Sequence, residues 1–250
     1  AAMGQAGVSV EETTITLPTY APGGYDKTPV FYTGRVYQGA QGRVYPYPMQ
    51  DVLHDVKLDE TYKYLTLENR WLQMGLLPEH GGHLLNFTDK HSGFETFYRQ
   101  HVVKPALIGM LGAWISGGVE WNFPHHHRAT SAMPVDWKLA SNTDGSKTIW
   151  IGETELRRRL KWTIGLSLLP DRAVLQAENI FMNRGPTIES MLYWANVSVH
   201  CGDDYQVLFP PSCHLGFDHH KNFWTSFPIG PKSVDHSWIP SQRSKFADDA

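Results

Sequence analysis

The sequence has few cysteines, few charges and no long apolar run, and each shortage excludes a class of protein. Two cysteines, Cys201 and Cys213, occur in 250 residues, which is too few for a disulfide framework. No run of about 18 apolar residues exists, so no membrane-spanning helix is expected. Charged residues make up 19% of the chain, and the net charge of −3 is not accompanied by the basic cluster that nucleic-acid binding requires.

The short motifs of several enzyme classes are also missing. There is no GxSxG nucleophile elbow, no GxxxxGK[ST] loop, no HExxH and no GxGxxG before a helix, which disfavours a serine hydrolase, a nucleotide binder and a zinc peptidase. The first residues, AAMGQAG, lack the basic and apolar regions of a signal peptide. The compartment therefore stays open between cytoplasmic and, if a signal peptide was removed, periplasmic or secreted.

What the sequence does contain is a series of short β-strand patterns separated by turn chemistry. The clearest of them are Val8–Leu17, Tyr62–Leu67, Trp71–Leu76, Gly81–Phe87, Thr148–Glu155, Leu160–Leu168, Ala173–Phe181 and Ser190–His200. Segments such as NTDG and NRGP lie between them, and no long helical pattern appears. The spacing predicts an all-β fold of two antiparallel sheets packed face to face. We expect one domain over residues 1–250, with a strand- and turn-rich segment at 1–50.

The segment GMLGAWISGGVEWNFPHHHR at 109–128 carries the densest chemistry. In a strand, Glu120 and Asn122 lie on one face and Trp121 on the other. A carboxylate beside an amide suits a pair of sugar hydroxyls, and a carboxylate beside an indole suits acid–base work. We therefore predict that Glu120 is catalytic and that Trp114, Trp121 and Asn122 bind substrate; a structural carboxylate that bonds turn amides is the alternative.

Three consecutive histidines and an arginine follow Pro124. In extended structure His125 and His127 face one side and His126 the other, so at least one is expected to reach a site built around Glu120. His126 and His127 are predicted to be catalytic and His125 to bind substrate. The alternative role as metal ligands, with His214, His219 or His220, matches no known zinc spacing, so no metal or cofactor is assigned. Arg128 is expected either to bond a substrate or to brace Glu120.

A later strand pattern places Trp194, Asn196, Ser198 and His200 on one face. An indole stacks on the CH groups of a sugar ring, while amide and imidazole groups read its hydroxyls. We predict that Trp194 and Asn196 bind substrate and that His200 is catalytic. His83 follows the Gly81-Gly82 turn and is predicted to contribute to substrate binding.

A set of motifs resembles a known family. PTY at 18–20, VYPYP at 44–48, LEN at 67–69, LPEHGGHL at 77–84, KPALIG at 104–109, GAWISGGVEWNFPHHHR at 112–128 and WAN at 194–196 occur in the expected order. Together they resemble the domain-of-unknown-function family 5107, within the galactose-mutarotase-like superfamily. The resemblance implies a β-supersandwich with a carbohydrate cleft on one sheet.

The aldose epimerases of this superfamily use a histidine as acid and a glutamate as base. The resemblance implies that the acid histidine falls near His200 or Asn196, and a second histidine near His125–His127. The base glutamate is expected beyond residue 250, which implies a domain incomplete at its C-terminus and a chain that is part of a longer protein. His83 stands where relatives often carry arginine.

Three functions are consistent with these residues. The first is an enzyme that acts on a sugar or oligosaccharide, by epimerisation at C1 or by cleavage of a glycosidic bond. The second is a carbohydrate-binding module without turnover, and the third is a structural sandwich in a multidomain protein. No nucleic-acid or membrane partner is expected, and the sequence leaves the oligomeric state open.

Overall fold

The computed structural model describes residues 7–26, 45–48, 50, 52–108, 112–125, 127–218 and 223–239. The chain divides into two compact units, Ala1–Val199 and His200–Ala250. Each unit is described by itself below.

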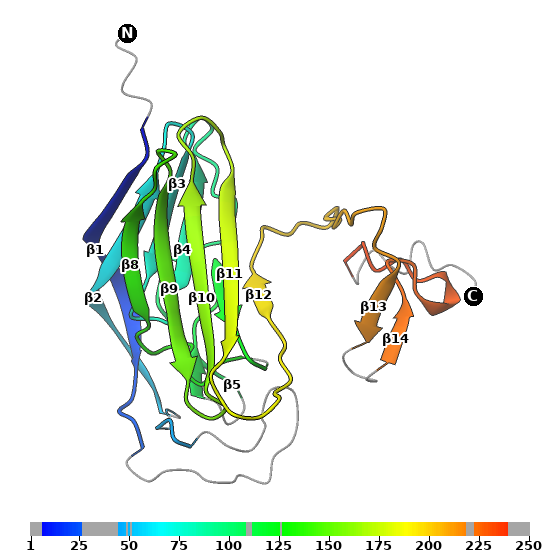
Figure 1. Cartoon of the computed structure of the whole chain (residues 1–250), viewed down its shortest axis with the longest axis horizontal. Coiled ribbons are helices and arrows are strands. Elements are labelled where there is room, and N and C mark those ends of the chain that lie inside the picture. The colour runs from blue at the N-terminus through cyan, green and yellow to red at the C-terminus, as the bar shows by residue number, and fades with distance from the viewer. Residues whose placement is uncertain are drawn as a thin grey trace. The chain divides into compact units, whose positions relative to one another are not determined.

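The first unit contains a six-stranded antiparallel sheet with the order β1-β2-β3-β4-β7-β12 (Figure 1). Its strands are β1 (Ser9–Pro22), β2 (Leu53–Glu68), β3 (Leu72–Leu77), β4 (His83–Asp89), β7 (Val119–Asn122) and β12 (Trp194–Val197). Strand β1 continues past Pro18, where the sequence predicts its end. This is tolerated at the edge of the sheet because the outer side of β1 bonds Val103 through the Pro18 carbonyl, at 2.9 Å, and the Tyr20 N–H, at 2.8 Å, and needs no N–H from Pro18.

A four-stranded antiparallel sheet, with the order β11-β10-β9-β8, packs on the larger sheet and lies in front of it in Figure 1. Its strands are β8 (Asp136–Ser141), β9 (Lys147–Glu155), β10 (Leu160–Leu168) and β11 (Leu175–Asn183), and a short pair, β5 (Ala106–Ile108) and β6 (Gly112–Trp114), is separate. The two antiparallel sheets confirm the predicted all-β sandwich.

The core lies between the two sheets because each contributes one apolar face. Alternate residues of β2, β3 and β4 pack there against β9 and β10, and the fully buried ones include Leu65, Met74, Leu84, Ile149, Ile151, Trp162 and Ile164. A second cluster, Tyr62, Leu77, Leu85, Val103 and Ile115, lies on the outer face of the six-stranded sheet. The larger sheet is therefore apolar on its inner face and over part of its outer face. The rest of the outer face, beside the second cluster, carries polar side chains.

The second unit is small and rich in loops. Strands β13 (Leu215–Asp218) and β14 (Phe223–Ser226) form a hairpin, followed by a 3₁₀ turn, η1 (Pro231–Ser233). The rings of Phe209 and Phe227 pack edge to face with centroids 4.6 Å apart. A single domain over residues 1–250 remains a prediction.

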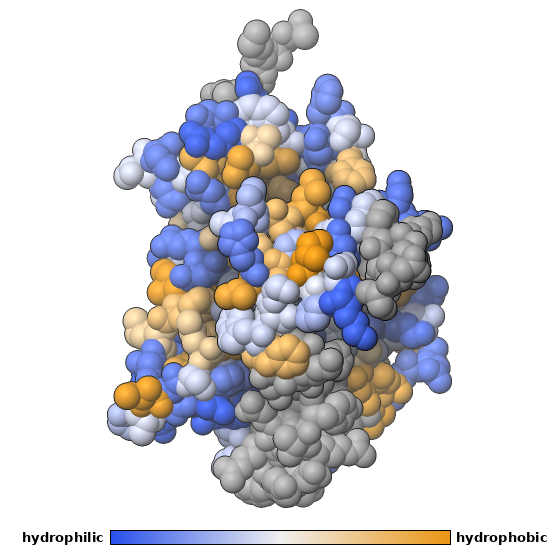
Figure 2. All heavy atoms as spheres, turned by 90° about the vertical axis from the view of Figure 1, so that its right-hand side faces the viewer, coloured by the Kyte–Doolittle hydropathy of each residue, from blue (hydrophilic) through white to orange (hydrophobic). Residues whose placement is uncertain are grey.

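The surface drawn in Figure 2 is mixed in character, and neither cysteine is in a disulfide. Hydrophobic and hydrophilic residues both reach the face drawn in Figure 2. Both cysteines are free thiols, and Cys201 is exposed. Within the described ranges, no helix has the length and apolar character needed to cross a bilayer.

Candidate active site

Polar side chains cross the outer face of the six-stranded sheet in two adjacent rows. Glu120 on β7 pairs with Asn196 on β12, and Asn122 pairs with Trp194. Because Leu84 on β4 pairs with Val119, the neighbouring His83 lies opposite Glu120 in this antiparallel pair. His83, Glu120 and Asn196 therefore form one row across three strands, and Asn122 with Trp194 forms the next.

A glycine allows β7 to approach β4 closely enough for this row to form. Gly118 has φ +55°, and a Cβ atom there would lie 1.9 Å from the Leu84 carbonyl oxygen. Its N–H donates to the Tyr98 carbonyl at 2.7 Å, and its own carbonyl accepts from the Ser198 N–H at 2.9 Å. Gly118 therefore joins three segments directly before β7, two residues before Glu120.

Glu120 is a buried carboxylate with both oxygens engaged. Its Oε2 lies 2.9 Å from His127 Nδ1, and its Oε1 accepts a hydrogen bond of 2.8 Å from Ser131 Oγ. Burial acts to raise the pKa of Glu120, but His127, Ser131 and Asn122 outweigh it, and the pKa lies below its usual range. Glu120 is therefore a fixed negative charge whose nearest partner is an imidazole.

His127 lies between two indole rings. Its ring centroid is 5.5 Å from that of Trp114 and 4.6 Å from that of Trp194, with the Trp194 contact edge to face. Because Nδ1 is turned to the Glu120 carboxylate, Nε2 is the nitrogen left for an outside partner. A carboxylate that orients an imidazole in this way is the arrangement found in acid–base sites. The two indoles provide apolar faces beside the nitrogen that is able to move a proton.

Arg128 holds the loop that carries His127. Its backbone N–H donates to Asn122 Oδ1 at 3.2 Å, and its Nε donates to the Trp121 carbonyl at 2.6 Å. The guanidinium also donates to the Gly81 carbonyl at 2.6 Å and to Glu153 Oε1 at 2.7 Å. Of the two predicted roles, the structure favours bracing, but the braced groups are these and not Glu120.

Three buried polar side chains beside the cluster have unpartnered atoms in the part of the chain that the structure describes. They are His80, with both ring nitrogens, His83 Nε2 and Asn122 Nδ2. Burial lowers the pKa of His83 to about 4, although the charge of Glu120 acts to raise it. Burial likewise lowers the pKa of His80, whose ring packs edge to face against Tyr62 at 4.8 Å. Both imidazoles are neutral at pH 7.

Two predicted contact residues lie away from this cluster. Trp121 packs in the core between the sheets, 6% exposed, and its Nε1 donates to the Gly82 carbonyl at 3.0 Å. It faces the core because Glu120 and Asn122 occupy the outer positions of the same strand. His125 lies 3.4 Å from Ser190 Oγ, whereas His127 contacts Glu120, so the predicted placement of His125 and His127 on one side fails.

For two predicted catalytic residues the structure gives no position relative to Glu120. His126 lies outside the described residues. His200 was expected on the strand that carries Trp194, but β12 ends at Val197, and His200 belongs to the second unit. Sequence reasoning missed Ser131, because a lone serine in the segment ATSAM carries no signal of its own.

Two hollows lie elsewhere on the parts of the molecule that the structure describes. One of about 440 Å³ lies in the second unit, lined by Phe209, Cys213 and Phe227 among others. Another of about 290 Å³ lies on the outer face of the four-stranded sheet. Among the described residues, no three of His, Cys, Asp and Glu are grouped to hold a metal ion.

Comparisons with known proteins give a family and a structural neighbour. The family model described as "Domain of unknown function (DUF5107)" matches residues 40–245. The structure is similar to that of a TPR-domain containing protein from Parabacteroides distasonis, with a TM-score of 0.69 and 26% identity. The match covers 80% of this chain and 33% of that protein, so the chain spans about a third of its neighbour's length.

Proposed function

The chain belongs to the domain-of-unknown-function family DUF5107, and on the geometry around Glu120 we propose that it is a carbohydrate-active protein. The proposed ligand is a pyranose or an oligosaccharide, bound at the outer face of the six-stranded sheet by Trp114, Trp194 and Asn196. The observation that carries this proposal is the buried Glu120–His127 pair, at 2.9 Å, between two indole rings. Membership of the galactose-mutarotase-like superfamily is part of the same proposal.

Two indoles beside polar groups suit a sugar. A pyranose ring presents CH groups to an aromatic face while its hydroxyls point sideways toward donors and acceptors. Asn122 pairs with Trp194 across the two strands, and Asn196 lies two residues after Trp194 on the same face of the sheet. Both amides are therefore direct neighbours of the indole. A neutral ligand also fits a site whose one carboxylate is already paired.

His127 is the proposed proton-transfer group. Glu120 fixes the imidazole through Nδ1, which leaves Nε2 to give a proton to a ring or glycosidic oxygen, or to accept one from the anomeric hydroxyl. Glu120 is then a positioning residue whose charge stabilises the imidazolium. The reaction we propose is acid–base chemistry at the anomeric carbon, either epimerisation at C1 or cleavage of a glycosidic bond.

A second candidate is binding without turnover. It is favoured by the engagement of both oxygens of Glu120, since neither is left as an independent base. In that case the indoles dominate affinity and His127 contributes orientation alone.

Anomeric exchange of glucose and galactose, followed by NMR, separates the two candidates. We expect exchange above the uncatalysed rate in the wild type, and a loss of about 10²-fold or more in His127→Gln, the range of one general acid–base group. Glu178→Gln, an exposed carboxylate on β11, is the matched control. If the wild type binds the sugar but exchange stays at the uncatalysed rate, the epimerase is contradicted. If the wild type binds neither sugar, both candidates are contradicted.

A further inference from the structure

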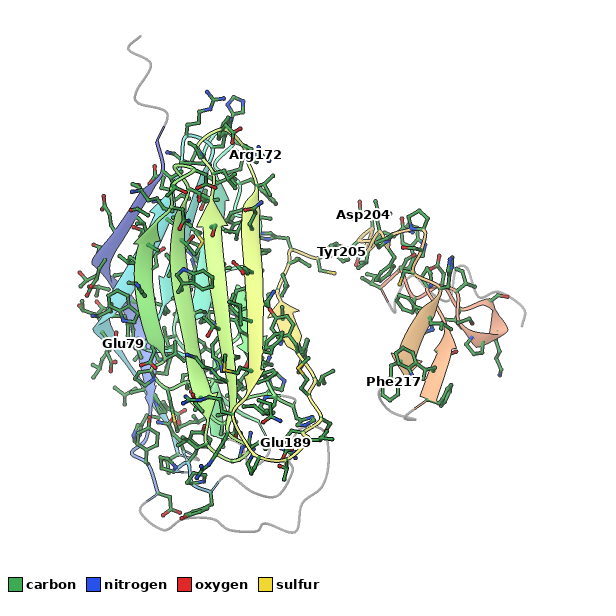
Figure 3. The ribbon with its side chains drawn as sticks, in the orientation of Figure 1. Glu79, Arg172, Glu189, Asp204, Tyr205 and Phe217 are labelled. Carbon is green, nitrogen blue, oxygen red and sulfur yellow. The ribbon has the colours of Figure 1, made fainter. Side chains whose placement is uncertain are left out.

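The outer face of the four-stranded sheet carries a hollow that the proposed sugar site does not use. This sheet lies in front in Figure 3, where Arg172 and Glu189 mark its two ends. The hollow has a volume of about 290 Å³ and is lined by β8, β9 and β10 together with Arg184. Its size is at the lower end of ligand pockets, about 300–1,000 Å³, and fits one sugar-sized ring.

Two glycines shape the hollow. A Cβ atom at Gly165 would lie 2.6 Å from Cζ3 of Trp150, so the indole rests against the backbone of β10. One face of Trp150 is therefore turned to the sheet and the other outward. Gly152, which pairs with Asp136 and Thr163, lies in the next row and contributes no side chain. The hollow therefore has a flat indole on one side and, at Gly152, backbone that carries no side chain.

The rim of the hollow is mainly cationic. Lys138, Lys161 and Arg184 line it, and Asp136 is the carboxylate that faces them from β8. Neither Lys138 nor Lys161 forms an ion pair with any residue that the structure describes. Glu153 also borders the hollow, but its carboxylate is turned to Arg128 at 2.7 Å. Two unpaired ammonium groups, Lys138 beside the indole and Lys161 farther along the same hollow, favour a ligand that is both anionic and partly apolar.

We propose that this hollow is a second binding site, which takes one hexuronate ring of an acidic glycan. The ring stacks on the outward face of Trp150, its carboxylate lies between Lys138 and Lys161, and Thr163 bonds a hydroxyl. The site is separate from the Glu120 cluster, because it lies on the other sheet and on the opposite outer face.

Amide shifts in the ¹⁵N spectrum of the full chain test the site directly, with trigalacturonate, neutral galactotriose and inorganic phosphate as probes. We expect trigalacturonate to shift Gly152 and Thr163, and the other two probes to bind at least tenfold more weakly. Binding should weaken in high salt, since exposed charges are screened. Equal shifts with galactotriose or with phosphate at these amides, or no shift with trigalacturonate, overturn the proposal.

Variants separate the site from the fold. Both lysines line the hollow and not the core, so the double variant Lys138→Gln, Lys161→Gln is expected to keep the fold and to weaken trigalacturonate binding at least tenfold. Lys147→Gln, on the same sheet but outside the hollow, is the matched control and should bind as the wild type does. Unchanged binding in the double variant overturns the proposal. Shifts at Trp114 and Trp194 with neutral sugar are read in the same spectra, so failure here is distinct from failure of the proposed function.

Discussion

Replacing Arg128 by methionine tests whether this residue braces the site from within the fold. The side chain of Arg128 is 1% exposed and that of its partner Glu153 is 14% exposed, with 2.7 Å between Nη1 and Oε1. Removing one partner of a buried pair costs about 3–5 kcal/mol, because the other charge stays buried. The carbonyls of Trp121 and Gly81 lose their donors as well, although Thr130 and Trp162 still donate to Glu153. We expect the free energy of unfolding to fall by about 3–5 kcal/mol.

Urea unfolding of the wild type and the variant measures this loss. Arg128→Met combined with Glu153→Gln is expected to lose less than the sum of the two single changes, since no charge is left without its partner. Arg172→Ala is the control, because its pair with Asp171 is exposed to solvent and should contribute little to stability. A loss below about 1 kcal/mol for Arg128→Met would refute the bracing role.

Three further predictions concern residues of the six-stranded sheet. Because the pKa of His83 is lowered to about 4, the unfolded chain binds a proton there that the folded chain does not, so stability falls as the pH drops from about 6.5 to 4. His83→Gln should remove about 3 kcal/mol of that fall, measured by urea unfolding at both ends of the range, and an unchanged pH dependence would show that His83 is not the group responsible. Gly75→Ala places a Cβ 1.7 Å from the Tyr64 hydroxyl. Gly75→Ala should lower stability by about 1–3 kcal/mol in thermal unfolding. Gly24→Ala, where a Cβ would meet no atom within 4 Å, should lower it by less than about 0.5 kcal/mol. Equal losses in the two variants would contradict the close packing at Gly75. Trp194→Ala should weaken sugar binding, measured by calorimetric titration, with little loss of stability. Trp121→Phe should lower stability and leave sugar binding unchanged. Weaker binding in Trp121→Phe with unchanged binding in Trp194→Ala would reject the assignment of the two faces.

Strand identity followed from the sequence where a strand is long and buried on one face. The predicted Leu160–Leu168 matches β10, because its apolar residues alternate without interruption and the turn residues Leu169–Arg172 follow it. The predicted Ser190–His200 was too long. Only Trp194–Val197 pairs with β7, and alternation alone does not show where a neighbouring strand ends. His200 was assigned to the site on that overextended strand.

The face of a residue was predictable, but contacts made by loops were not. Glu120, Asn122, Trp194 and Asn196 lie on one face as the period of two requires. His127 contacts Glu120 from outside the strand, and the next residue, Arg128, is held by groups far along the chain, Gly81 and Glu153. Such long-range partners leave no local pattern, which is why Ser131 and the partners that Arg128 contacts were not predicted from the sequence.

The indole N–H signals of Trp114 and Trp194, followed by NMR during titration with a neutral oligosaccharide, test the sugar site most directly. Both indoles contact His127, whereas Trp121 and Trp162 are buried in the core and are internal controls. We predict shifts at Trp114 and Trp194, none at Trp121 and Trp162, and weaker binding in Glu120→Gln. Saturating concentrations of a panel of neutral sugars that leave Trp114 and Trp194 unmoved would contradict a carbohydrate site at this face.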